Sequence, residues 1–277
     1  MNWSGAKNWL IVLFLGVNIF LIITLINNNI ASSTVSDDLV QKTVAVLARN
    51  QITIDPALIP RDIPKLGTIE VENNILDMSG LADTIFSGNY TYDAASGQYV
   101  SEDRTLTFEG DTLTYTDPTP DKAFMNLNEK LACDLVLDTL KLYGFRMDKA
   151  SAHAYAADGD NYTVLVEQGI DRYQLLDSRF VAKVCANGIL SLEGTWFSAS
   201  ENQGYFGGAS SKVKPVTSIL IDFISDAARV QNGSAVVTDI DIGYTTGDKS
   251  TYHKSVTAMP VWRICTADGH EYYFDAR

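Results

Sequence analysis

The chain has 277 residues, of which 46% are hydrophobic and 10% aromatic, and its formal net charge is −13. Lys7 is the only charged residue in residues 1–28, so the remainder carries −14. This acidity excludes nucleic acid as a partner and disfavours adsorption to anionic lipid or wall polymers. It either favours a basic protein partner or only keeps an exported domain soluble. The hydrophobic content suffices for two modest cores, which predicts two domains.

Residues 9–26 carry no charge, and as a helix they would span roughly 27 Å, enough for one membrane crossing. We expect a cytoplasmic stub at 1–8 and a transmembrane anchor at 9–27. Because Lys7 precedes the segment and Asp37 and Asp38 follow it, the N-terminus is predicted to be cytoplasmic and the C-terminal domain extracellular. The alternative is a cleaved signal peptide, but its apolar region usually has only about 7–15 residues, and Asn29-Ile30-Ala31 fits a cleavage site poorly.

Asn18 is the one strongly polar side chain inside the anchor. Helical spacing places it on a face with Phe14, Leu21 and Leu25, which we predict to contact a partner helix in the membrane. The alternative is an amide that bonds to its own backbone, since membrane hydrogen bonds contribute only about 0.6 kcal/mol on average.

The first extracytoplasmic subdomain is expected at 28–118. Ser36 is a predicted N-cap for a helix that ends near Arg49, and the prolines of 55–66 predict an extended, non-helical path. Four short strands follow, which predict an antiparallel meander. They lie at Tyr90–Tyr92, Gln98–Val100, Thr105–Phe108 and Thr112–Tyr115.

The second subdomain, 119–277, is expected to begin with a helix over 127–143, ended by Gly144. Strands near 151–157, 162–168, 172–184 and 189–198 should pair antiparallel, because their connections are short. From Pro215 an amphipathic helix is predicted, followed by strands at 235–245, 256–266 and 271–275. Asp268-Gly269 joins the last two in a hairpin, whose two apolar faces predict a central position in the sheet.

Together these elements predict an α+β protein. A single N-terminal transmembrane helix precedes an extracytoplasmic region of two α+β subdomains, whose antiparallel sheets are covered by helices.

The three cysteines, Cys133, Cys185 and Cys265, are too few for a disulfide framework or a paired-cysteine metal site. We expect buried, unreactive thiols, with a Cys185–Cys265 bridge as the alternative.

Residues for catalysis are sparse, and the sequence predicts no catalytic, cofactor or metal residues. His153, His253 and His270 show no metal-ligand spacing, and no nucleophile motif is present. The carboxylate pairs, Asp158 with Asp160 and Asp239 with Asp241, fit solvated residues better than a cation site. A cell-surface hydrolase or glycan-binding module remains the alternative, and it would require convergent carboxylates in a cleft.

Both ends of the chain resemble those of a known protein family. The start, Met1-Asn-Trp-Ser-Gly-Ala-Lys7 and then Leu10-Ile-Val-Leu-Phe-Leu-Gly-Val-Asn-Ile-Phe-Leu21, resembles the stub and anchor of YycI proteins. The close, Met259-Pro-Val-Trp-Arg-Ile264 and Asp268-Gly-His-Glu-Tyr-Tyr-Phe-Asp-Ala276, is similar to the C-terminal hairpin shared by YycI and YycH. The middle of the chain offers no such match.

The resemblance implies a non-enzymatic, membrane-anchored accessory protein of low-G+C Gram-positive bacteria. It would act with a YycH-like protein on a sensor histidine kinase of the WalK (YycG) type, which governs cell-wall metabolism, and it would contact the kinase partly through the anchor. Activation and inhibition both remain open. For the ectodomain contact we expect exposed aromatics such as Tyr205 and Phe206, or an open sheet edge; the alternative is that these two side chains pin their loop onto the core.

Overall fold

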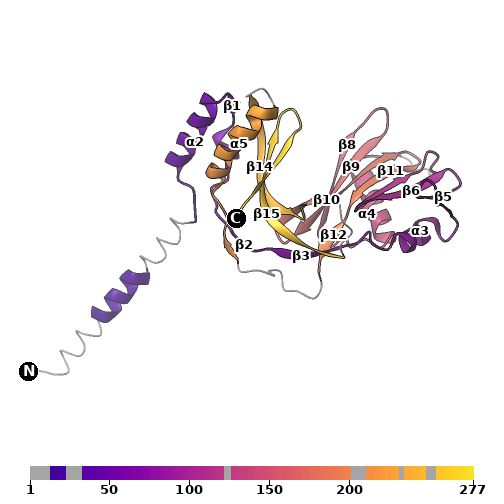
Figure 1. Cartoon of the computed structure of the whole chain (residues 1–277), viewed down its shortest axis with the longest axis horizontal. Helices are drawn as coiled ribbons and strands as arrows, with labels where there is room; N and C mark the ends of the chain where they lie inside the picture. The colour runs from indigo at the N-terminus through magenta and orange to yellow at the C-terminus, as the bar shows by residue number, and fades with distance from the viewer. Residues whose placement is uncertain (1–12, 23–32, 122–125, 201–209, 231–233, 248–253) are drawn as a thin grey trace, which may run out of the picture. The chain divides into compact units, whose positions relative to one another are not determined.

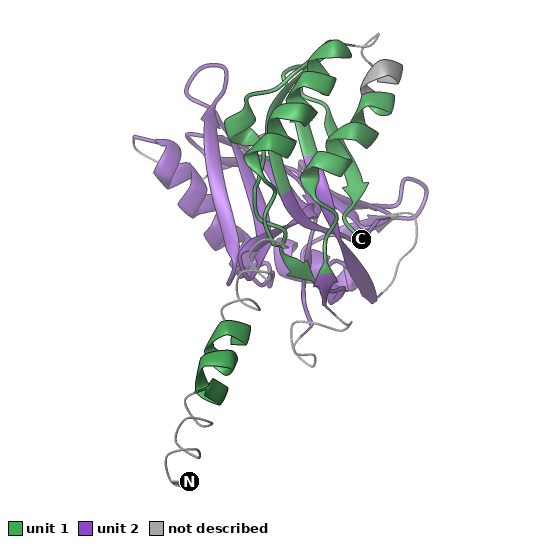
Figure 2. Cartoon of the chain, turned by 90° about the vertical axis from the view of Figure 1, so that its left-hand side faces the viewer, with its two compact units in different colours: residues 1–66, 212–241, 264–277 green, residues 67–211, 242–263 purple. Residues whose placement is uncertain are grey.

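The computed structural model describes residues 13–22, 33–121, 126–200, 210–230, 234–247 and 254–277. They form an α+β fold in which antiparallel strand pairs predominate (Figure 1). The chain divides into two compact units: unit 1 comprises residues 1–66, 212–241 and 264–277, and unit 2 comprises residues 67–211 and 242–263 (Figure 2).

Unit 1 places two helices, α2 (Asp37–Arg49) and α5 (Val216–Val230), side by side over one face of its strands (Figure 2). Ser36 caps α2 as predicted, because its side chain accepts a hydrogen bond from the Leu39 N–H. The predicted apolar stripes face inward. Their buried members are Val40 and Leu47 of α2 and Val216, Ile219, Leu220 and Phe223 of α5.

The strands of unit 1 come from distant parts of the sequence. β1 (Ile52–Thr53) pairs parallel with the start of β14 (Ala235–Thr245), of which residues 235–241 belong to unit 1. β16 (Glu271–Asp275) pairs with β15 (Ser255–Thr266), of which residues 264–266 belong to unit 1. The predicted hairpin is confirmed, but the prediction that it is central in the sheet is wrong for β16. Among the described strands β16 pairs with β15 alone, and Tyr273 is 44% exposed.

The proline-rich stretch 55–66 is not wholly extended, which corrects the prediction. A short 3-10 helix, η1 (Pro56–Leu58), begins there, because Asp55 accepts a hydrogen bond from the Ala57 N–H and proline is tolerated in a first turn. Further along, β2 (Lys65–Leu66) pairs with β13 (Ser211–Lys212).

Unit 2 is built on a large sheet in which successive strands are antiparallel neighbours. The order is β8-β9-β10-β11-β7-β6-β5-β4. These strands are β4 (Thr91–Asp93), β5 (Gln98–Ser101), β6 (Arg104–Glu109), β7 (Thr112–Thr116), β8 (Ala150–Ala156), β9 (Tyr162–Ile170), β10 (Tyr173–Cys185) and β11 (Gly188–Thr195). The predicted meander and the antiparallel pairing of the later strands are both confirmed.

The core of unit 2 lies between this sheet and two helices, α3 (Met78–Phe86) and α4 (Glu129–Leu142). The sequence predicted α4 but not α3. Helix α3 is capped by Asp77 and contributes Leu81, Ile85 and Phe86 to the core. Trp196 closes the core, with its ring stacked on Phe180 at 5.4 Å between centroids.

The segment predicted as one strand at 189–198 contains two. β11 stays in the large sheet, whereas β12 (Phe197–Ala199) pairs with β3 (Ile69–Asn73), which also pairs with β15. Between them lies Trp196, which is fully buried and donates its indole N–H to the Arg146 carbonyl at 3.0 Å. Burial of this ring separates the two strands.

The predicted limit between residues 118 and 119 lies inside unit 2. Strand β7, before this position, pairs with β11, which follows it. That residues 118 and 119 mark the boundary between two independently folding subdomains therefore stays a prediction.

Candidate functional site

The predicted anchor face is described over residues 13–22, which are helical. Phe14 and Leu21 are 69% and 56% exposed, and the Asn18 amide donates a hydrogen bond to the Phe14 carbonyl at 2.9 Å. The sequence left open the alternative that the amide bonds to its own backbone, and this hydrogen bond is of that kind. It uses only one of the two N–H groups of the amide. Leu25 lies outside the described residues. In the part of the chain that the structure describes, no helix combines the length and apolarity of a membrane span.

Tyr205 and Phe206 also lie outside the described residues, so their role as an ectodomain contact stays a prediction.

The carboxylate pairs and the histidines singled out in the sequence come from different places. Asp158 and Asp160 are exposed in the turn between β8 and β9 of unit 2, whereas Asp239 and Asp241 lie on β14 in unit 1. His153 is exposed on β8, His270 lies in the β15–β16 hairpin of unit 1, and His253 is outside the described residues. Among the residues described, no three His, Cys, Asp or Glu side chains form a group that could hold a metal ion.

Cys133, Cys185 and Cys265 form no disulfide bond with one another, and all three are half-buried rather than buried as expected. The alternative of a Cys185–Cys265 bridge is therefore wrong. Cys133 is half-buried on α4, and burial, with smaller contributions from the charges of Asp134 and Glu129, raises the pKa of its thiol. A raised pKa leaves less of the reactive thiolate at neutral pH, which agrees with the predicted inert character of Cys133.

Two buried carboxylates have structural partners. Asp177 accepts hydrogen bonds from the Thr245 hydroxyl at 3.0 Å and the Thr246 N–H at 2.7 Å. Asp111, in the β6–β7 turn, accepts one from the Asn73 amide at 2.6 Å. Both carboxylates hold backbone segments of unit 2 together.

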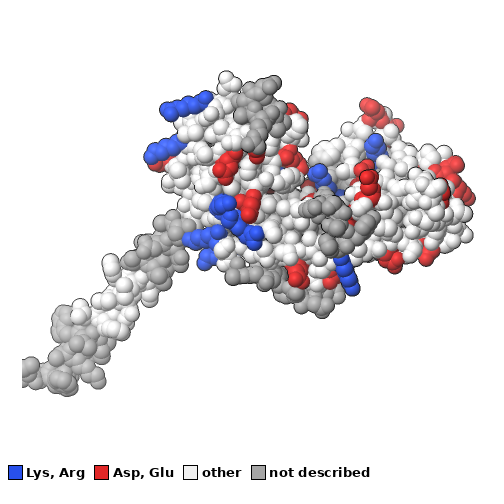
Figure 3. Space-filling view, viewed as in Figure 1, with Lys and Arg blue, Asp and Glu red and all other residues white. Residues whose placement is uncertain are grey.

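The charge of the protein is divided unevenly between the units. Unit 2 contains 23 acidic and 12 basic residues, a formal charge of −11, whereas unit 1 contains 11 acidic and nine basic residues, a charge of −2. On the face shown in Figure 3, the end of unit 2 that carries α3, β5 and β6 displays acidic atoms, and the basic atoms lie elsewhere.

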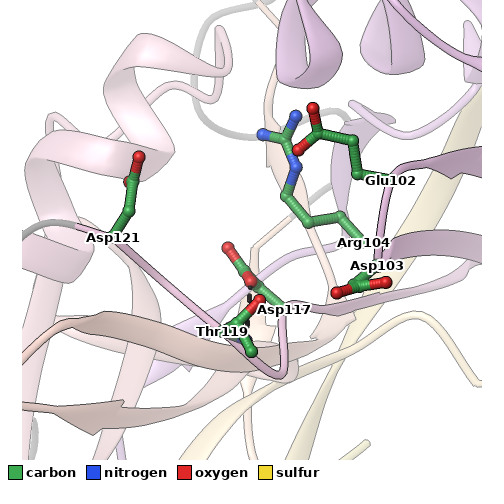
Figure 4. Close-up of a pocket in the computed structure, with 6 residues that line it drawn as sticks. All are labelled: Glu102, Asp103, Arg104, Asp117, Thr119 and Asp121. Atoms are coloured by element: carbon green, nitrogen blue, oxygen red, sulfur yellow. Dashed lines mark hydrogen bonds between the residues drawn. The ribbon is translucent and has the colours of Figure 1, made fainter.

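At this end of unit 2 lies a polar pocket of about 220 Å³ (Figure 4). It is lined by Glu102, Asp103, Arg104, Asp117, Thr119 and Asp121. Arg104 donates to the Ser101 hydroxyl at 3.2 Å, and Asp117 accepts hydrogen bonds from the Tyr115 hydroxyl at 3.2 Å and the Thr119 N–H at 3.1 Å. Burial is the main cause that raises the pKa of Tyr115, and the neighbouring Tyr143 and Asp117 add to it.

This lining has four carboxylates and one guanidinium, so the pocket is suited to cationic groups rather than anions. It contains no Ser, Cys or Lys beside a histidine base, so its residues do not form an activated nucleophile.

Sequence reasoning assigned no role to the aromatic residues of β4 and β5. The ring of Tyr99 on β5 contacts those of Tyr90 and Tyr92, and β4, which carries Tyr92, is the last strand at this edge of the sheet. Two signals in the sequence could have found them. Tyr90 and Tyr92 are two residues apart in a predicted strand, and Arg104 is the only basic residue in residues 67–121.

These features define an α+β protein. One of its units is acidic and has a cluster of tyrosines at one edge of its sheet. The family model described as YycI protein matches residues 30–277, and the chain therefore belongs to the YycI family. No curated protein matches the sequence.

Two solved structures are similar to this chain. The crystal structure of YycH from Bacillus subtilis matches with a TM-score of 0.46 and 9% identity over 77% of this chain. The match covers 54% of YycH, so the chain spans about half the length of that structure. The YpeB C-terminal domain from Bacillus megaterium matches with a TM-score of 0.32 and 11% identity, over 72% of this chain and 92% of that domain.

Proposed function

We propose that this chain is a membrane-anchored, extracytoplasmic accessory regulator of a sensor histidine kinase of the WalK (YycG) type. It acts together with a YycH-like protein on the control of cell-wall metabolism, through protein contacts and without catalysis of its own. The observation that carries the proposal is the YycI family match over residues 30–277.

The membrane part of the proposal is supported by the uncharged stretch 9–26 and by the apolar side chains of the helix 13–22, which are exposed to solvent when the chain is taken alone. Such side chains lose no contacts when lipid surrounds them. We infer a single span with a cytoplasmic N-terminus and an external C-terminal domain, since Lys7 precedes the stretch.

A hydrolase or glycan-binding module would need carboxylates that converge in a cleft. The carboxylates of the unit 2 pocket share it with Arg104 and with no nucleophile and base pair, and no observation in the described residues favours this second function.

The anchor is proposed to be an interaction surface as well as a tether. The Asn18 amide still has one N–H group and its carbonyl oxygen to offer a partner helix beyond its bond to Phe14. Its replacement, Asn18→Leu, is expected to weaken co-purification of the kinase about threefold, which corresponds to the ~0.6 kcal/mol of an average interhelical hydrogen bond in a membrane. The amount of protein recovered in the membrane fraction should not change.

Phe20→Leu is the matched control, because Phe20 lies two residues from Asn18 and therefore points away from it on a helix. An anchor with the same apolar residues in scrambled order tests the whole face. Full kinase regulation with both Asn18→Leu and the scrambled anchor would show that the segment only tethers the ectodomain.

A further inference from the structure

A row of side chains crosses the sheet of unit 2 and emerges from the core at the β4 edge. Tyr92 lies opposite Tyr99, Tyr99 opposite Leu106, and Leu106 opposite Tyr115, so all four lie on one face. Leu106 is fully buried, Tyr99 is half-buried and Tyr92 is 55% exposed. The exposed fraction of the side chains therefore increases along this row, from the core to the surface at β4. We define the tyrosine rim as Tyr90, Tyr92 and Tyr99.

The rings of the tyrosine rim form one contiguous cluster. The ring of Tyr99 lies 4.8 Å from that of Tyr92 and 5.4 Å from that of Tyr90, measured between centroids. Phe86 contacts Tyr90 at 6.1 Å and anchors the rim to α3. Contacts of this kind hold the rings in place, so a ligand that meets them loses little side-chain entropy of the protein.

The segment that carries this cluster is strongly acidic. Residues 67–121 contain 11 acidic residues and only one basic residue, Arg104. A hydrogen bond to Asp83 is the main cause that raises the pKa of Tyr90, and burial followed by the charges of Tyr92, Asp77 and Asp83 raises the pKa of Tyr99. Asp77 and Asp83 are therefore close enough to act on the rim electrostatically.

Phe86, the ring beside the tyrosine rim, already contacts a cationic side chain of this chain. The guanidinium of Arg104 lies over the ring of Phe86, with Cζ 5.3 Å from the ring centroid. An aromatic face attracts cations through its quadrupole, and nearby carboxylates add to the attraction. A second guanidinium or ammonium at the exposed ring of Tyr92 would repeat this arrangement.

The strand that carries Tyr92 also has an open edge. In the part of the chain that the structure describes, β4 pairs with β5 and with no other strand. Its outer N–H and C=O groups can therefore receive an extended segment of a partner.

We propose that the tyrosine rim is a docking surface for a basic segment of a partner protein, whose Arg or Lys side chains lie on the rings of Tyr92 and Tyr99 and are attracted by the nearby carboxylates of Asp77 and Asp83. The inference rests on the proposed function in one respect, namely that this chain acts by contact with another protein.

The test uses the full chain in phosphatidylcholine nanodiscs and a short fluorescein-labelled peptide that alternates arginine and serine. Binding is measured by fluorescence anisotropy at low salt. Tyr92→Leu should weaken the affinity about two- to fivefold, because it removes the ring but keeps an apolar side chain. Tyr92→Phe should keep the affinity, since it keeps the ring, and Asp83→Asn should lower it, since it removes a charge and preserves the shape.

Tyr155→Leu is the matched control, because Tyr155 on β8 is 58% exposed and belongs to the same unit. Thermal unfolding of each variant verifies that the fold is intact. Equal peptide affinity for Tyr92→Leu and Tyr155→Leu would overturn the proposal, because the net charge of the protein alone would then explain the binding. Binding of a chito-oligosaccharide that depends on Tyr92, with unchanged peptide affinity, would also overturn it and assign the rim to glycans.

Neither the kinase nor a YycH-like protein takes part in this measurement. Failure of the proposed function would show instead as unchanged kinase regulation in cells that lack the whole chain, so the two outcomes can be told apart.

Discussion

At the scale of single residues, Tyr244 links the stability of unit 2 to pH. Its side chain is 1% exposed and contacts the ring of Tyr173 at 6.2 Å between centroids. Burial, followed by the influence of Tyr173 and Asp171, raises the pKa of Tyr244 to about 12 from its ordinary value of 10.0. The folded protein therefore holds this proton at a pH where the unfolded chain has released it.

The sign of the effect follows from the linkage between proton binding and folding. The contribution of Tyr244 to the free energy of unfolding is constant below pH 10. It is lost as the pH rises from 10 toward 12, because the Tyr244 hydroxyl ionises in the unfolded chain before it ionises in the folded protein. The free energy of unfolding should fall by up to about 1.4 kcal/mol per pH unit in this window because of this one group. Tyr244→Phe should make that fall shallower in urea unfolding series between pH 9 and 11.5. If Tyr244→Phe and the exposed control Tyr155→Phe give the same slope as the native chain, Tyr244 does not contribute.

The Asn18 interpretation also belongs to this scale. The sequence left open whether the amide bonds to a neighbouring helix or to its own backbone. The structure contains the bond to Phe14, which satisfies part of the amide and lowers the cost of placing it in lipid.

At the scale of elements, α5 contributes strongly to the core of unit 1. Phe223 is fully buried and its ring lies 5.0 Å from Tyr272 and 6.3 Å from Phe274 of β16. Tyr272 and Phe274 are two residues apart on β16 and therefore share one face of the strand, which agrees with their contacts with one ring of α5.

Phe223→Ala should lower the free energy of unfolding by about 3–5 kcal/mol, because it leaves a cavity between α5 and β16. Ile221→Ala, at a position of the same helix that is 43% exposed, should cost less than about 1 kcal/mol. Urea unfolding of the two variants measures the difference. Equal losses would mean that the helix does not pack through its Phe223 face.

Helix α3 shows why one element was not predicted. It has nine residues and contains Gly80, which lowers helix propensity by roughly 1 kcal/mol relative to alanine. The structure supplies the reason for the glycine. A Cβ at position 80 would collide with the side chain of Asp77, which caps the helix and accepts a hydrogen bond from the Gly80 N–H at 2.9 Å.

At the scale of the whole molecule, the folded part of the chain begins before the first predicted helix. A fragment that starts at the N-cap of that helix, residues 36–277, should fold as a stable, soluble protein. However, Ser33 and Val35 form backbone hydrogen bonds to Ile63 and Arg61, both at 2.8 Å, and Val35 is buried. A fragment of residues 33–277 should therefore be more stable than one of residues 36–277, and comparison of their thermal unfolding measures the effect.

We predict that this ectodomain fragment binds the ectodomain of a YycH-like protein weakly. Weak contacts suffice between proteins tethered to one membrane, because tethering raises their effective concentration. Analytical ultracentrifugation or calorimetry of the mixed ectodomains tests this prediction. No complex at concentrations up to roughly 100 μM would leave the anchor helix as the route of action.

The sequence by itself determined the elements whose signals are local. The N-cap Ser36, the helix-ending Gly144, the apolar stripe of α5 and the Asp268-Gly269 turn all act within about ten residues, so they predict α2, α4, α5 and the last hairpin. The two ends of the chain also carried the family resemblance. The match over residues 30–277, which includes the C-terminal end, confirms the family.

Only the tertiary structure decided which strands are neighbours. Phe197 of β12 lies opposite Asn73 of β3, and Ile52 of β1 lies opposite Ala235 of β14. Such pairs join segments more than a hundred residues apart, and no local pattern encodes their register, because many strands of similar composition could bury the same apolar face. The tyrosine rim also depends on the tertiary structure. The sequence predicted strands at Tyr92 and Tyr99, but only the sheet order shows that β4, with Tyr92, is an edge strand paired with β5.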